Sequence, residues 1–157
     1  MTKRWNFVLL LFFGAFGCSA PVEPTVGENE ARAVRDGVEF TLRLEKVQLR
    51  LSDTLKGTFE VWNRTNSERA FEFLNQQQLG FEIQRPNGET VQQWPILFQP
   101  AASRFVLQPN QRRTLVLQAL LIDWRTGHPL PTGRFWLSAY LLDDNSPRVR
   151  LGIEIRE

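Results

Sequence analysis

Residues 71–94 read FEFLNQQQLGFEIQRPNGETVQQW, and this stretch decides the fold of the chain. Large apolar residues alternate with polar ones at Phe71 and Phe73 and again at Phe81 and Ile83. This period-2 pattern is typical of strands with one buried face. The turn residues Pro86-Asn87-Gly88 follow, in which proline presets φ and the next two residues accept positive φ. We therefore predict that residues 81–85 and 90–94 pair as a β-hairpin.

The same alternation recurs along the rest of the chain, with turn residues between the runs. The runs are residues 38–44, 47–51, 55–61, 104–107, 114–121, 135–141 and 149–155. The phase of the alternation changes at Glu45-Lys46, which indicates a bulge or a strand that changes sheets. Short strands at this spacing predict an all-β fold, an immunoglobulin-like antiparallel β-sandwich of eight or nine strands.

The N-terminus has the features of a targeting segment. Lys3 and Arg4 precede an apolar run from residue 5 to residue 16, which is shorter than the roughly 20 residues that span a bilayer. The segment Ala15-Phe16-Gly17-Cys18 resembles the lipobox of bacterial lipoproteins, which implies that Cys18 is lipidated and becomes the mature N-terminus. Plain secretion after cleavage near Gly17 and an uncleaved anchor remain as alternatives.

These features divide the chain into three parts. We expect a lipoprotein-type signal peptide over residues 1–17, a flexible tether over residues 18–36, and one sandwich domain over residues 37–157. The chain would then lie in the bacterial cell envelope, outside the cytoplasm and attached to the membrane through lipid on Cys18. Cys18 is the sole cysteine of the sequence, so disulfides do not contribute to the fold.

The charge balance gives no sign of a nucleic-acid partner. The chain has 19 basic and 17 acidic side chains, and the signal peptide carries the excess at Lys3 and Arg4. The mature chain therefore has no net formal charge, and it has no cluster of lysine and arginine beside aromatic residues.

The order of several short motifs resembles the domain of the intracellular proteinase inhibitor BsuPI. The motifs are Trp62-Asn63, Phe71-Glu72-Phe73, Phe81-Glu82-Ile83, Asn87-Gly88, Val91, Trp94, Phe98, Leu107-Gln108-Pro109, Asp123-Trp124 and Pro131-Thr132-Gly133. The resemblance covers roughly residues 51–142. It implies an immunoglobulin-like sandwich and, through the founding member of the family, inhibition of serine proteases. Many relatives that carry a lipobox have no established activity, and no inhibitory residue is carried over by motif.

Two loops are candidates for partner binding. The segment 95–100 places three large apolar residues between Pro95 and Pro100, and we expect it to plug one end of the core. The loop before the strand at 135–141 is longer and offers the side chains Trp124, Arg125, His128 and Arg134. Arg125 would suit a trypsin-like specificity pocket. Trp94 and Trp124 are predicted to anchor the core.

The sequence offers little for catalysis. His128 is the sole histidine, so neither a histidine metal cage nor a cysteine–histidine pair can form, and Asp143-Asp144-Asn145 is expected to be a turn. We expect no metal, no cofactor and no enzymatic activity. The favoured function is a membrane-tethered extracytoplasmic binding or scaffolding module that contacts an envelope protein through a sheet edge or an apolar loop. The alternative is an inhibitor of an extracytoplasmic serine protease that acts through an exposed loop.

Overall fold

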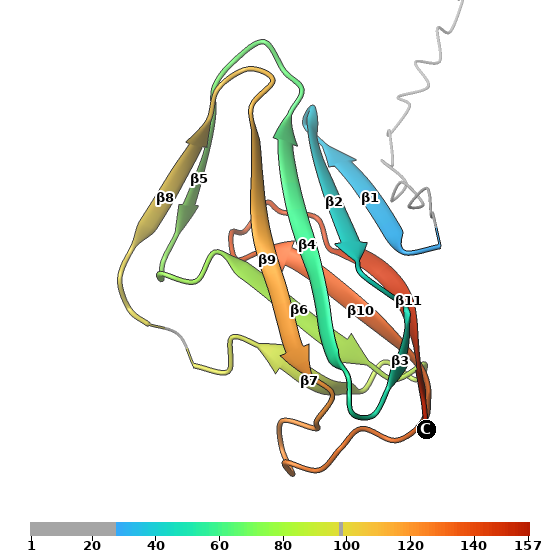
Figure 1. Cartoon of the computed structure of the whole chain (residues 1–157). Coiled ribbons are helices and arrows are strands. Elements are labelled where there is room, and N and C mark those ends of the chain that lie inside the picture. Colours follow the sequence, from blue (N-terminus) through green and yellow to red (C-terminus); the bar gives the residue numbers. More distant parts are fainter. Residues whose placement is uncertain (1–27, 98) are drawn as a thin grey trace, which may run out of the picture.

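The computed structural model describes residues 28–97 and 99–157, and that part of the chain is all-β, as predicted (Figure 1). The predicted signal peptide, Cys18 and residues 19–27 lie outside the described residues. Eleven strands follow one another: β1 Glu30–Arg35, β2 Val38–Leu44, β3 Gln48–Arg50, β4 Thr54–Asn63, β5 Arg69–Phe73, β6 Leu79–Gln84, β7 Thr90–Trp94, β8 Ser103–Leu107, β9 Arg112–Leu120, β10 Gly133–Leu141 and β11 Val149–Arg156. No helix of the described residues is long and apolar enough to span a bilayer.

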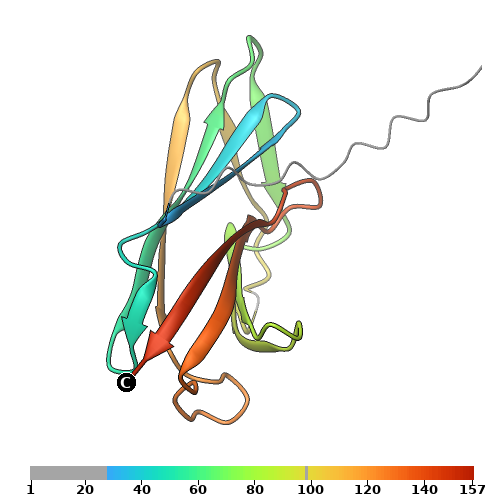
Figure 2. The same cartoon turned by 90° about the vertical axis from the view of Figure 1, so that its right-hand side faces the viewer.

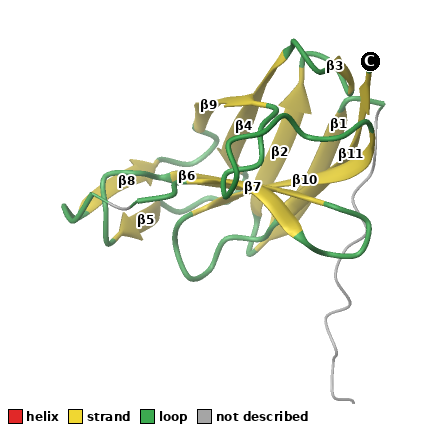
Figure 3. Ribbon diagram, turned by 90° about the horizontal axis from the view of Figure 1, so that it is seen from below, coloured by secondary structure: helices red, strands yellow, loops and turns green. Residues whose placement is uncertain are grey.

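Two sheets form the sandwich. One has the strand order β1-β2-β4-β9 and the other the order β3-β11-β10-β6-β7, and Figure 2 shows them as two layers. A third, two-stranded sheet of β5 and β8 projects to one side of both (Figure 3). The predicted alternation explains the core: in β4, Leu55, Phe59 and Val61 are fully buried, whereas Lys56 between them is exposed.

The predicted hairpin is confirmed. β6 and β7 pair antiparallel, with Phe81 opposite Trp94, and the ladder shifts register next to Gln84. In the turn, the Arg85 N–H donates to the Glu89 carbonyl oxygen at 2.8 Å, and Gly88 has a φ of 89°. Positive φ is the reason a glycine stands there.

The phase change at residues 45–46 marks a strand that changes sheets. β2 belongs to the four-stranded sheet, whereas β3 pairs with β11 in the five-stranded sheet. The β3–β11 pairing is parallel, with Leu49 opposite Ile155, and is an exception to the otherwise antiparallel ladders between the strands.

The boundary of the tether, predicted at residue 36, is too late. β1 pairs along its whole length with β2 through a turn at Asp36 and Gly37, whose φ angles are 51° and 77°. Ala31 of this strand is fully buried, and Glu30 forms ion pairs with Arg32 and Arg43. The alternation escapes notice in the sequence because the residues that face the core, the buried Ala31 and the partly buried Ala33, are small. The described residues form eleven strands instead of the predicted eight or nine, because β1 was not predicted and residues 38–50 form two strands, β2 and β3.

Candidate functional site

β9 is an open edge of the four-stranded sheet. It pairs with β4 on one side, and no strand of the described residues pairs with it on the other. Its odd-numbered residues Leu117 and Ala119 are buried in the core, whereas Val116 is 77% exposed and Leu120 is 59% exposed. From residue 114 to residue 120 the strand carries no charge. A long apolar edge of this kind is a ready template for another strand.

The other edges of the two sheets are each protected. β1 carries three charged side chains, Glu30, Arg32 and Arg35, and β3 is three residues long. The edge of β7 is covered by the loop that follows β9, since the Trp124 N–H donates to the Val91 carbonyl oxygen at 3.0 Å. Charge, shortness and a covering loop are the usual ways to prevent edge-to-edge pairing. β9 has none of these along residues 114–120.

A groove runs beside β9, toward the edge of the other sheet. It has a volume of about 290 Å³ and is lined by Gln76, Gln77, Gln78, Leu79, Phe81, Trp94, Leu115, Val116 and Gln118. Trp94 lies opposite Phe81 in the ladder and therefore faces the core side of the sheet. Because β7 is an edge strand, half of the Trp94 side chain remains exposed, at 49%. The prediction that Trp94 is a core anchor is wrong for this reason.

The loop after β7 presents apolar surface instead of plugging the core. Leu97 is 82% exposed and Ile96 is also exposed, which contradicts the expected plug. Three hydrogen bonds hold the loop to the one after β5. The Gln77 Nε2 group donates to the Leu97 carbonyl oxygen at 3.4 Å, the Gln99 N–H donates to Gln77 Oε1 at 3.1 Å, and the Gln76 N–H donates to the Gln99 carbonyl oxygen at 3.3 Å. We call residues 114–120, the adjoining groove and the exposed side chains of Trp94, Ile96 and Leu97 the apolar edge.

The second predicted loop serves mainly to cover β7. Asp123 organises it, because its Oδ1 atom accepts from the Arg125 N–H at 2.9 Å and its carbonyl oxygen accepts from the Gly127 N–H at 2.8 Å. Trp124 is 38% exposed, so the prediction that it is a core anchor is wrong as well. His128 is exposed at the surface of this loop.

Arg125 is already paired. Its guanidinium lies 2.8 Å from Glu89 Oε1 and 3.2 Å from Asp123 Oδ2. Its hydrogen bond holds the pKa of Asp123 below the usual value, and the two carboxylates raise the pKa of Arg125. Arg134 does not belong to this loop: it lies in β10 opposite Glu154 and lines a different hollow, together with Trp136. The structure therefore does not bring the four predicted side chains together into one site.

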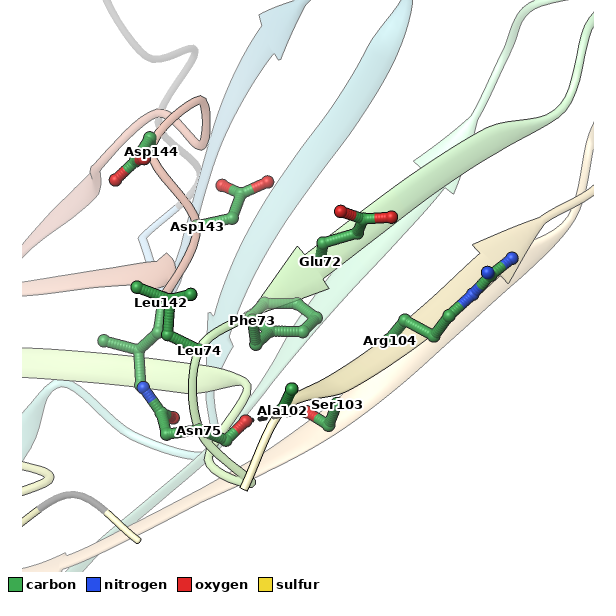
Figure 4. Close-up of a pocket in the computed structure, with 10 residues that line it drawn as sticks. All are labelled: Glu72, Phe73, Leu74, Asn75, Ala102, Ser103, Arg104, Leu142, Asp143 and Asp144. Carbon is green, nitrogen blue, oxygen red and sulfur yellow. Dashed lines mark hydrogen bonds between the residues drawn. The ribbon is translucent and has the colours of Figure 1, made fainter. Parts of the chain in front are cut away.

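A larger pocket, of about 610 Å³, lies between the β5–β8 pair and the turn after β10 (Figure 4). Acidic side chains line it at Glu72, Asp143 and Asp144, and Phe73 supplies apolar wall. Burial raises the pKa of Asp143. Figure 4 shows Glu72 and Asp143 on facing elements. Arg104 lines the same pocket, so its wall carries both signs of charge. Among residues 28–97 and 99–157, no group of three His, Cys, Asp or Glu side chains is placed to hold a metal ion.

The apolar edge was not predicted as a site from the sequence. A sheet edge was expected as a possible contact surface, but an alternating sequence does not reveal which strand ends a sheet. The available signal is the run Leu115-Val116-Leu117 with Ala119, Leu120 and Leu121, in which both faces of a strand are apolar. A strand buried on both faces gives the same pattern.

Comparison with known proteins gives distant likenesses in structure. No family model matches the sequence, and no curated protein does. A β-glucosidase from Listeria innocua is 11% identical over 76% of this chain and 16% of that chain, with a TM-score of 0.46. The DNA glycosylase AlkC from Pseudomonas fluorescens is 14% identical over 74% and 29%, with a TM-score of 0.47. A CARDB domain from Pyrococcus furiosus is 11% identical over 73% and 84%, with a TM-score of 0.41. The chain thus spans about a sixth of the glucosidase, and at these scores none of the three bears on what it binds.

Proposed function

We propose that the protein is a membrane-tethered extracytoplasmic binding module without catalytic activity, which holds an envelope protein at the apolar edge. The observation that carries this proposal is an uncharged edge strand, residues 114–120, beside a groove and an exposed apolar loop. Exposed apolar side chains on an edge strand and on the loop beside it, in a domain whose other sheet edges are protected, are typical of a contact surface. The resemblance to the BsuPI domain agrees with a binding role, since that family is known for an inhibitor.

The tether depends on Cys18. Lipidation contributes about 0.8 kcal/mol per buried CH₂ group, so two or more acyl chains anchor a protein firmly. The Cys18→Ala protein should move from the membrane fraction to the soluble fraction on cell fractionation. A variant that stays in the membrane with its N-terminus uncleaved would contradict lipid anchoring.

Site-specific photo-crosslinking in cells tests the binding role. A benzophenone amino acid is placed at position 97 or 116 on the apolar edge, and at position 145 in the exposed turn after β10 as the matched control. Positions 97 and 116 should yield the same crosslinked product, and position 145 should not. Val116→Lys, which places a charge on the edge, should abolish the product at position 97. Equal products at all three positions, or none at any, would contradict the proposal.

Protease inhibition is the second candidate, and one observation favours it. Leu97 projects from a loop that begins at Pro95, and proline lowers the entropy lost when a loop enters a cleft. Leu97 suits a protease pocket for apolar side chains better than Arg125 suits a pocket for cations, because the guanidinium of Arg125 is already paired. A panel of serine proteases assayed with wild type, Leu97→Asp and Arg125→Ala separates these possibilities. Inhibition that Leu97→Asp removes and Arg125→Ala leaves intact would support this second function.

A further inference from the structure

We infer that the segment bound at the apolar edge is an extended strand of a partner polypeptide, which adds antiparallel to β9 and ends in an acidic residue near Arg113. This inference rests on the proposed function and names the chemistry of its partner. The main-chain phase of β9, the composition of the groove and the position of Arg113 each contribute to it.

The main chain of β9 has hydrogen-bonding groups directed away from β4 at even-numbered residues. The Asn63 N–H donates to the Gln111 carbonyl oxygen at 3.0 Å, and this bond sets the phase of the ladder. In an antiparallel pair, bonded and non-bonded residues alternate, so Arg113, Leu115 and Leu117 bond to β4. The N–H and C=O groups of Thr114, Val116 and Gln118 therefore point toward the open side.

On the side of β9 that faces away from β4, the C-terminal end of the strand already has a hydrogen-bond partner, whereas residues 114–118 have none among the described residues. The Leu120 carbonyl oxygen, on the same open side, accepts from Gln92 Nε2 at 3.3 Å. Within the described ranges 28–97 and 99–157, no hydrogen bond engages the main-chain groups of Thr114, Val116 or Gln118 on that side. An incoming strand therefore has about five residues of β9 to pair with, a length typical of peptides that add to a sheet edge.

The groove has the chemistry of a site for an uncharged strand. None of its lining residues is charged, and its apolar wall includes Phe81, Trp94 and Leu115. Four glutamines, at 76, 77, 78 and 118, line it as well. Each amide both donates and accepts, as the backbone of an extended peptide requires. Alternate side chains of the incoming strand would enter this groove, so they should be apolar or small.

Arg113 selects the acidic end of the partner segment. Its guanidinium donates to Gln78 Oε1 at 3.0 Å, which brings it to the rim of the groove, and it lies 4.6 Å from the centre of the Phe105 ring. No carboxylate of the described residues lies within ion-pair distance of it. Because β9 starts beside Arg113, an antiparallel partner strand ends there, and a carboxylate at its C-terminal end would complete the pair.

A second copy of this chain fits the edge less well. Two β9 strands that pair antiparallel about Val116 would place Arg113 opposite Ala119, and residues 114–120 offer no carboxylate to it. In this register the second copy's β9 therefore supplies no glutamate or aspartate to Arg113, whereas a different polypeptide can. A partner polypeptide is therefore the proposed occupant, and self-association is an outcome that the test distinguishes.

The test uses the full chain purified in detergent and three synthetic peptides. Acetyl-STVTVTE-amide has the inferred pattern and direction, acetyl-STVTVTK-amide reverses the terminal charge, and acetyl-ETVTVTS-amide reverses the direction. Amide hydrogen exchange followed by NMR should slow at least roughly tenfold at Thr114, Val116 and Gln118 when the first peptide is bound. Leu115 and Leu117 should already exchange slowly. The first peptide should bind roughly fivefold more tightly than the second, and more tightly than the third.

Two variants at one position separate strand addition from side-chain packing. Gln118→Pro removes an N–H group that points away from β4, so the fold should survive, as prolines are tolerated on the open side of edge strands. Gln118→Ala removes the same side chain and keeps the N–H group. The proline variant should bind the first peptide at least roughly tenfold more weakly than the alanine variant, because both lack the glutamine side chain and only the proline variant also lacks the N–H group.

The outcomes are distinct. If both variants bind alike, or if the amides of Thr114, Val116 and Gln118 gain no protection, strand addition is wrong, and the crosslinking at positions 97 and 116 decides separately whether the binding role stands. Concentration-dependent dimerisation in analytical ultracentrifugation that Gln118→Pro abolishes would overturn the partner polypeptide in favour of a second copy. A preference for the reversed or lysine peptide would overturn the direction or the role of Arg113.

Discussion

The side-chain amide of Gln92 donates a hydrogen bond to the main-chain carbonyl oxygen of Leu120 at 3.3 Å and thereby joins the edge strands of the two sheets. Gln92 lies in β7 and is almost completely buried, and Leu120 is the last residue of β9. The bond closes one end of the gap between the two edges. Toward the other end of β9, Arg113 donates a hydrogen bond to Gln78, which lines the groove.

Gln92→Ala should lower the free energy of unfolding by about 1 to 2 kcal/mol, because it removes a largely buried side chain together with its hydrogen bond to the Leu120 carbonyl oxygen. Urea denaturation of the variant and wild type measures the difference. Gln93→Ala is the matched control, because Gln93 is the next residue of the same strand and is more exposed; it should change the free energy by less than about 0.5 kcal/mol. Equal effects of the two substitutions would argue against a role for the bond.

Trp94→Ala should be a mild change for a tryptophan. A fully buried aromatic residue truncated to alanine costs about 3 to 5 kcal/mol, and Trp94 is half exposed, so about 2 kcal/mol is expected. Phe59→Ala, at a fully buried position of β4, should cost the full amount. Thermal unfolding of both variants gives the comparison. A loss of stability at Trp94 as large as the loss at Phe59 would show that the Trp94 side chain is packed in the core, as first predicted.

The contrast between these two aromatic residues shows the limit of the sequence. Alternation correctly places both on the core side of their strands, since Trp94 lies opposite the buried Phe81. Alternation carries no information on whether a strand lies in the middle of a sheet or at its edge, and that position decides how much of the side chain is covered. The exposed tryptophan and the apolar edge were missed for the same physical reason.

Features that depend on a few neighbouring residues could be predicted from the sequence more reliably than the position of a strand in its sheet. The positive φ at Gly88 and the sheet change after β2 both follow from residues quoted in the sequence. The partner-binding loop at Trp124, Arg125 and His128 was a different case, because composition suggested a recognition loop. In the fold, its main chain covers β7 and its arginine is bound by Asp123 and Glu89. Ion pairs between residues 36 positions apart cannot be inferred from composition.

Asn63→Ala should be among the most destabilising polar substitutions in the chain. Asn63 is fully buried, and its Nδ2 group donates to the carbonyl oxygens of Ser67 at 2.8 Å, Leu107 at 3.0 Å and Gln108 at 3.1 Å. Its Oδ1 atom accepts from Thr65 at 2.7 Å. Alanine leaves several of these groups unpaired, so a loss of about 3 kcal/mol or more is expected in urea denaturation.

Asn75→Ala is the matched control for Asn63. Asn75 is also buried, but its Oδ1 atom has no hydrogen-bond partner among the described residues. Removing an unpaired buried polar atom relieves a desolvation cost, so the alanine variant should be close to neutral. A strong loss at Asn75, or a weak one at Asn63, would contradict the assignment of these roles.

Two aspartates should give stability opposite dependences on pH. Burial raises the pKa of Asp143, and the charge of Asp144 adds to this, against hydrogen bonds from the backbone of Ser146 and Asn145. The folded state therefore binds this proton more tightly than the unfolded state, in which the pKa is about 3.9. The destabilisation is absent below that pH and complete above the raised pKa of the folded state. Asp143→Asn should therefore increase the melting temperature at pH 7 and not at pH 3. The matching gain in the free energy of unfolding should be below about 1 kcal/mol, because the carboxylate is partly solvated.

Asp53→Asn should show the reverse sign and serves as the control for that measurement. The hydrogen bond from the Lys46 ammonium group, at 2.6 Å, and one from the Arg50 N–H, at 2.7 Å, lower the pKa of Asp53 in the fold. The carboxylate therefore stabilises the fold above the unfolded pKa, and this contribution is lost as the pH falls through the lowered value. The Asn variant should melt below wild type at pH 7, and the difference should shrink toward pH 3. Melting curves for the two variants that shift in the same direction with pH would show that burial at Asp143 does not outweigh its hydrogen bonds.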